Sequence, residues 1–512
     1  MKHRPVDLRE RANQTNSLYY FLLIIAFLDF LLIILPNDLS TYQDKAMMIP
    51  NLLFIGTALL RDKTKETKKL FTLGAVMVVW YIIAQVLHHF AGLRVRPLSV
   101  FTSVYLVALP FASVACDGEE ARGLKGYACL FGAGMIVVIG YACMVLVKHV
   151  PWFLENNVFF WVNGIYLVSH PSQMGGILLA GIFLALAMLC AVKQIALKVV
   201  LAVGCILLFA VLSMTICNAA IWMACILLGV FVFLVINKGG VVRALAGLLV
   251  AVVVVAGAHQ MSKGMLSWGW EQAFGTPIPK QLLGMQIMSP DTAIETDRYQ
   301  IVFPQAIASA GKVTFDTERL ESLHAFRSSP PVHMTGKRNQ AAELLALSLK
   351  LPRLNGRTPL WIKAFNAIQQ NPEVIIRGID YTYYFMLDYD GTELTHMHNS
   401  WFEVLTALGL PGLLVVVLIT IVAFWHVFAI LFGKEYELWK KCIALLVVAL
   451  MGVGAMEPHL FLGGHFLPDR NNLHPVDFTF FLSIGYLVEW RAMARKKRKQ
   501  NADGLSVAEI KE

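Results

Sequence analysis

The feature that most constrains this sequence is a series of apolar runs, each long enough to cross a bilayer. A helix needs about 20 mainly apolar residues to cross the hydrocarbon layer. Hydrophobic residues make up 57% of the chain and charged residues 15%, whereas about a quarter of a soluble domain is charged. We therefore expect an all-α polytopic membrane protein. The composition excludes a soluble enzyme, a disordered chain and a nucleic-acid-binding domain, despite the net charge of +9.

Twelve candidate transmembrane spans follow one another along the chain, at about 17–35, 44–60, 70–88, 98–115, 126–147, 172–191, 198–215, 218–236, 241–260, 401–431, 440–458 and 474–490. The long stretch from 260 to 400 has no such run, so it is expected to be one large, partly helical external loop. The predicted organisation is then an N-terminal membrane bundle of about nine spans (1–259), this loop (260–400), about three C-terminal membrane helices (401–490) and a basic tail (491–512).

Basic residues predict the orientation, because Lys and Arg in short loops stay in the cytoplasm. With both termini cytoplasmic, the inside segments hold 25 of the 43 basic residues, and the short outside loops hold 5. The sequence therefore predicts cytoplasmic termini and places the 260–400 loop at the outer face of the cytoplasmic membrane. The basic run in the tail, 495–499, is an orientation signal that also favours anionic lipid.

The external loop has an uneven charge pattern. From Lys337 to Arg377 there are seven basic residues against two acidic ones, and from Asp380 to Glu393 there are four acidic residues and no base. Arginines beside carboxylates suit a site that grips a phosphate-rich group and activates a hydroxyl. An ordinary solvated surface would give the same pattern, so charge alone leaves both interpretations open.

The end of the loop combines a histidine with a helix start. Ser400 and Glu403 have the spacing of a capping box, which would begin the helix of the tenth span. A helix start offers free backbone N–H groups and favours anions. His398, just before it, is a candidate general base or an interfacial hydrogen-bonding residue. His396 and His398 lack a zinc signature, so no metal and no cofactor are expected.

Two segments of this region resemble the bacterial O-antigen ligase/O-antigen polymerase superfamily of integral-membrane glycan transferases. The first is Gly356-Arg357-Thr358-Pro359-Leu360-Trp361, followed by Asn371-Pro372 and Gly378. The second is His398-Asn399 ahead of a leucine-rich helix that ends in Gly409-Leu410-Pro411-Gly412. The position of the large loop, between the ninth and tenth spans, also resembles the layout of that family.

The resemblance implies a metal-independent glycosyltransferase. Its donor would be an oligo- or polysaccharide on undecaprenyl pyrophosphate, its acceptor a glycan or glycolipid, and membrane lipids would surround it. Arg357 would hold the leaving pyrophosphate, and His398 would activate the acceptor hydroxyl. Asn399, beside that histidine, would help to bind substrate.

The sequence departs from the family where a second arginine is expected in a Ser-Arg-Gly pattern. The matching stretch, 215–220, contains Asn218 and no arginine. The resemblance leaves three substitutes for substrate binding: Asn218 in a reduced role, Arg298 or Arg377. Arg353, on a segment that could lie at headgroup level, is a further candidate.

Two other classes of function remain open at this point. A transporter or flippase of lipid-linked glycans would share the many spans. Acidic residues such as Asp29 and Glu457 are few within the predicted spans, and an ion-coupled transporter usually needs several ionisable groups there. A membrane sensor that uses the external loop as a binding domain is the weaker alternative.

Overall fold

The computed structural model is a bundle of helices, and its described residues contain no strand. These residues are 52–53, 55–56, 65–91, 103–109, 171–214, 217–237, 239, 241–274, 373–378, 399–457, 460–462 and 475–509. The elements are α4 (Lys65–Phe90), the π-helix η2 (Ser103–Ala108), α9 (Pro171–Ala191), α10 (Ile195–Met214), α11 (Asn218–Ile236), α12 (Val241–Phe274), α19 (Glu373–Arg377), α20 (Ser400–Phe432), α21 (Leu438–Gly454) and α22 (Pro475–Glu509).

Five of these helices are long and apolar enough to cross a membrane: Lys68–Phe90, Ile195–Ser213, Asn218–Ile236, Val241–Trp268 and Ser400–Phe432. The protein is therefore an integral membrane protein. Several helix bounds lie close to the predicted spans; α11 covers the predicted 218–236, whereas α12 continues well past 260. The predicted spans 17–35, 44–60, 98–115 and 126–147 lie largely or wholly outside the described residues, so the total of twelve stays a prediction.

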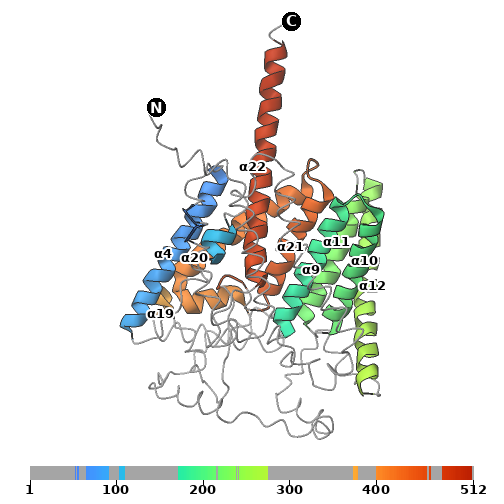
Figure 1. The fold of residues 1–512 in the computed structure, drawn as a ribbon, viewed down its shortest axis with the longest axis horizontal. Coiled ribbons are helices and arrows are strands. Elements are labelled where there is room, and N and C mark those ends of the chain that lie inside the picture. Colours follow the sequence, from blue (N-terminus) through green and yellow to red (C-terminus); the bar gives the residue numbers. More distant parts are fainter. Residues whose placement is uncertain are drawn as a thin grey trace, which may run out of the picture.

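The core of the bundle is α21, which packs against α9, α11, α20 and α22. Figure 1 shows α4 and α20 on one side, α9 to α12 on the other, and α21 and α22 between them. Small residues allow close approach, as expected between membrane helices. A Cβ on Gly175 of α9 would lie 2.7 Å from Cys217, and one on Gly176 would lie 2.9 Å from Val476. These two glycines are therefore sites of close helix packing.

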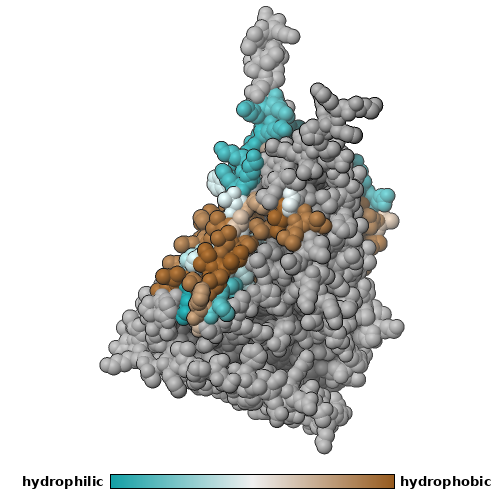
Figure 2. Space-filling view, turned by 60° about the vertical axis from the view of Figure 1, so that its left-hand side comes forward, coloured by the Kyte–Doolittle hydropathy of each residue, from teal (hydrophilic) through white to brown (hydrophobic). Residues whose placement is uncertain are grey.

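The outer face of the bundle is apolar where lipid would contact it. On α4 the exposed side chains include Val76, Val79, Ile82, Ile83 and Val86. Figure 2 shows the resulting apolar band, with hydrophilic residues beyond it at both ends. Such a band is the surface that a hydrocarbon layer covers.

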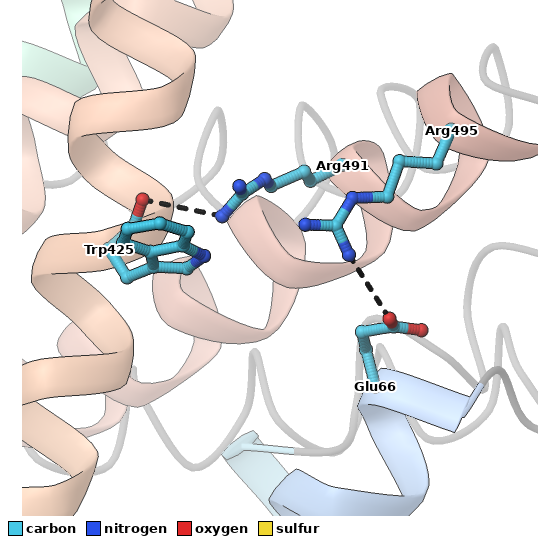
Figure 3. Close-up of polar contacts among 4 residues, drawn as sticks. All are labelled: Glu66, Trp425, Arg491 and Arg495. Atoms are coloured by element: carbon cyan, nitrogen blue, oxygen red, sulfur yellow. Dashed lines mark hydrogen bonds and ion pairs between the residues drawn. The ribbon is translucent and has the colours of Figure 1, made fainter. Parts of the chain in front are cut away.

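One end of the bundle collects almost all of the described basic residues. This end contains the start of α4, the connection between α20 and α21, and the part of α22 from which its C-terminal half projects out of the bundle (Figure 1). Figure 3 shows Arg491 of α22 donating to the Trp425 carbonyl oxygen at 3.4 Å and Arg495 pairing with Glu66 at 3.3 Å. The Arg491 guanidinium also lies 5.0 Å from the centre of the Trp425 ring. Burial, and then the charge of Arg495, lower the pKa of Arg491 from its usual value.

Candidate active site

The candidate site lies at the opposite end of the bundle, where four parts of the chain meet. They are the end of α4, the short helix α19, the first two turns of α20, and the connection from α21 to α22. Figure 1 shows α19 beside α4 and α20 at this end. Among the described Lys and Arg residues, Arg377 of α19 and Lys263 of α12 lie toward this end of the bundle.

A break in α20 shapes the site. Gly409 has φ 69° and ψ −173°, and Pro411 follows two residues later. The Trp401 indole N–H donates to Thr420 Oγ1 at 3.2 Å, although a straight helix would separate residues 19 positions apart by about 28 Å. The first two turns of α20 therefore fold back against the rest. The span predicted as one continuous helix over 401–431 is divided in two, because Pro411 has no N–H for the Ala407 carbonyl.

Helix α19 docks on this break through backbone contacts at two glycines, Gly378 and Gly409. Gly378, directly after α19, has φ 77°, and its backbone lies against Ala407 and Leu408. A Cβ on Gly409 would lie 2.7 Å from the Ile375 carbonyl oxygen and closer still to that of Ile376. The two family-like segments are thus joined at Gly378 and Gly409, two glycines with positive φ that are about thirty residues apart in the chain.

The start of α20 is capped by Asn399. Its Oδ1 accepts from the Trp401 and Phe402 N–H groups, both at 3.0 Å, and its Nδ2 donates to the Ala455 carbonyl at 2.9 Å. The predicted capping box is therefore wrong, since the cap is one residue earlier than Ser400. The sequence predicted free N–H groups at this helix start that could bind an anion. The N–H groups of Trp401 and Phe402 instead donate to the Asn399 side chain.

Ser400 instead connects α20 to the α21–α22 connection. Its hydroxyl donates to the Glu457 carbonyl at 2.7 Å and accepts from the Leu460 N–H at 3.1 Å. Ser400 and Glu403 are both buried. The helix start is consequently held from two sides, by its own cap and by a segment about sixty residues further along the chain.

Three residues that sequence reasoning missed hold this connection. Phe461 is buried and has φ 80°, a left-handed conformation that is strained for an aromatic residue. Its N–H donates to Asp477 Oδ1 at 2.6 Å, and its carbonyl accepts from the Tyr105 hydroxyl at 2.7 Å. The available signal was Asp477 itself, an acidic residue inside the predicted span 474–490, because a carboxylate buried in protein almost always has a partner.

Some of the predicted site residues lie in the described part of the chain and others lie outside it. Arg377 is half-buried at the end of α19, and its carbonyl oxygen lies 2.9 Å from His88 Nε2. Asn399 is the cap described above, and Asn218 is the first residue of α11, on the α9–α12 side of the bundle. The first two turns of α20 have Asn399 at their start, and Gly378, the residue after Arg377, lies against their last residues, Ala407 and Leu408. His398, Arg357, Arg353 and Arg298 lie outside the described residues.

Metal ligands do not gather in the part of the chain that the structure describes, which has no group of three His, Cys, Asp or Glu side chains able to hold an ion. His396 also lies outside it. The metal-independent reaction therefore stays a prediction.

In a comparison with known families, residues 203–417 match the sequence model of the family described as O-antigen ligase. The matched segment contains α11, α12, α19 and the break in α20, and both family-like motifs. No curated protein matches the chain significantly.

Proposed function

We propose that this integral membrane protein, a member of the O-antigen ligase superfamily through residues 203–417, transfers a glycan from undecaprenyl pyrophosphate to an acceptor sugar. The reaction would take place at the outer face of the cytoplasmic membrane. The observation that supports the proposal is the motif junction, which is the contact of Gly378 with Ala407 and Leu408 and of Gly409 with Ile375 and Ile376. It joins the end of the segment that carries Arg357 to the helix that follows His398, and a reaction that uses both residues would need these two segments to meet.

In the proposed reaction the acceptor hydroxyl oxygen attacks the anomeric carbon of the donor. The bond from that carbon to the pyrophosphate oxygen breaks, the hydroxyl proton passes to His398, and undecaprenyl pyrophosphate leaves. Arg357 would stabilise the negative charge that develops on the leaving group, because a cation fixed at that position needs no reorganisation during the reaction. No metal or nucleotide takes part.

The other predicted residues have supporting roles in this proposal. Among the candidate arginines, Arg377 lies in the described part of the chain, half-buried beside the motif junction. This position suits a second contact with the pyrophosphate. Asn399 would place His398 by fixing the start of α20. Arg298, Arg353 and Asn218 remain candidates for contacts with the glycan or the headgroup.

The test is release of undecaprenyl pyrophosphate by purified protein in detergent, with a lipid-linked glycan and candidate acceptors. We expect release to depend on an acceptor and to fall at least about a hundredfold in His398→Ala, as for loss of a general base, and similarly in Arg357→Ala. Arg357→Lys should recover only part of the activity, since Lys lacks the planar fork. The acceptor that works separates ligase from polymerase.

Two residues with exposed side chains provide matched controls: His89→Ala at the end of α4 and Arg243→Ala near the start of α12. Both variants should retain activity. Full activity in His398→Ala and Arg357→Ala would refute the residue roles. Loss of activity with EDTA would refute the metal-independent reaction. No release with any acceptor, from well-folded protein, would favour transport of lipid-linked glycans instead.

A further inference from the structure

Helix α4 lies outside the matched segment, yet it contacts both halves of the motif junction. Its Trp80 indole N–H donates to the Leu408 carbonyl at 2.8 Å. Its His88 Nε2 lies 2.9 Å from the Arg377 carbonyl, and because a carbonyl oxygen only accepts, Nε2 must carry the proton. The side chain of His88 is only 2% exposed.

The two carbonyls that α4 contacts need a donor from elsewhere. Arg377 is the last residue of α19, where helix carbonyls have no partner within the helix. Leu408 immediately precedes Gly409, where the chain leaves the helical conformation. Each carbonyl therefore directly precedes one of the two left-handed glycines. A buried carbonyl without a donor is costly, so the two side chains of α4 stabilise the broken backbone at the two points where it turns.

The same contacts also determine where Arg377 lies. The Trp80 ring packs against the other side of the break, with its Cδ1 3.5 Å from the position of a Cβ on Gly412. Trp80 and His88 are eight residues apart on one helix, so they act as a rigid pair of donors at a fixed spacing. Neither side chain needs to touch substrate to affect the geometry of the arginine.

We propose that His88 and Trp80 are positioning residues for the transferase site. They fix α19 and the start of α20 relative to each other, and so they place Arg377 and the cap of α20 for catalysis. This inference rests on the proposed function. It assigns to α4 a role that the O-antigen ligase match, which begins at residue 203, does not cover.

The test uses full-length protein in detergent and three variants. His88→Met removes the donor at similar volume, and His88→Gln keeps an N–H near the position of Nε2. Trp80→Phe removes the indole N–H together with the five-membered ring and keeps an aromatic ring. The matched control is His89→Met, because His89 is the next residue and is exposed. Hydrogen exchange of the backbone amides in 373–378 is measured beside kcat and KM for glycan transfer.

We expect His88→Met and Trp80→Phe to speed amide exchange in 373–378 and to lower kcat by about tenfold, with KM changed less than about twofold, because the lost bonds align the reacting groups rather than bind substrate. His88→Gln should recover most of both effects. His89→Met should resemble the wild type in both.

Three results would overturn the proposal. Unchanged exchange in His88→Met and Trp80→Phe would show that α4 does not hold α19. Faster exchange with unchanged kcat would show a contact without a positioning role. A His88→Gln variant as impaired as His88→Met would indicate packing rather than donation. If wild-type protein transfers no glycan, the positioning role falls with the proposed function, and the exchange measurement then shows separately whether the contact exists.

Discussion

At the scale of single residues, two glycines determine how the candidate site is built. Gly378 and Gly409 both have positive φ, and each lies against the backbone of the other's segment. The conformation of Gly409, near φ 69° and ψ −173°, belongs to a region that is essentially restricted to glycine. A side chain at either position would both strain the backbone and separate α19 from α20.

Gly409→Ala is predicted to destabilise the protein by about 1–3 kcal/mol from backbone strain, and to abolish transfer because the motif junction opens. The measurement is thermal unfolding in detergent, beside the release assay. Gly264→Ala is the control: it lies in α12, and a Cβ there would meet nothing within 4 Å. Alanine favours a helix interior, so the control should be as stable as the wild type or more so. Equal stability of the two variants would contradict the strained geometry.

At the scale of elements, the folded-back start of α20 is the unusual feature. A broken helix at membrane depth is tolerated only where its freed backbone groups are buried in protein and paired. Here the partners are Trp80 for the Leu408 carbonyl and the Asn399 side chain for the first N–H groups. The bond between Trp401 and Thr420 then holds the two parts of α20 together.

A double-mutant cycle on Trp401 and Thr420 tests the folded-back arrangement. Trp401→Phe removes the donor together with the five-membered ring, and Thr420→Val removes the acceptor at nearly constant shape. The cycle cancels the loss of the ring, which is common to the single and the double variant. We expect the two changes to be coupled by about 1 kcal/mol in the free energy of unfolding. In a straight helix the two residues would be independent, so a coupling energy near zero would contradict the break.

At the scale of the whole molecule, charge separates the two ends of the bundle. The described basic residues lie at the end where α22 emerges, except for Lys263 and Arg377. Arg498 also pairs there with Glu435. These pairs are partly exposed, and exposed pairs contribute little to stability. Their position nevertheless agrees with the predicted orientation, in which this end faces the cytoplasm.

Cysteine labelling tests that orientation. Lys497→Cys lies on the exposed part of α22, and Phe90→Cys lies at the opposite end of α4, where Phe90 is 82% exposed. A membrane-impermeant maleimide applied to intact cells should label Phe90→Cys, and should label Lys497→Cys only after permeabilisation. The unmodified protein gives the background from its native cysteines. The reverse pattern would place the candidate site in the cytoplasm and rule out the proposed reaction at the outer face.

Several features of this protein are readable from the sequence because they are local. Apolar runs predicted an all-helical membrane protein, and the helices α9 and α11 begin and end within a residue of the predicted spans 172–191 and 218–236. The motifs indicated the O-antigen ligase superfamily, and the match of residues 203–417 to the O-antigen ligase family model supports it. Hydrophobicity along a helix and short motifs are properties of neighbouring residues, so they require no knowledge of the fold.

Only the tertiary structure decided how the site is assembled. The cap of α20 is Asn399 rather than the predicted Ser400, because Ser400 is needed to hold the connection near Glu457. The donors to the broken backbone, Trp80 and His88, come from about 290 to 330 residues away in the chain. Orphaned backbone groups take whichever donor the packing brings near, and local sequence does not encode which helix that will be.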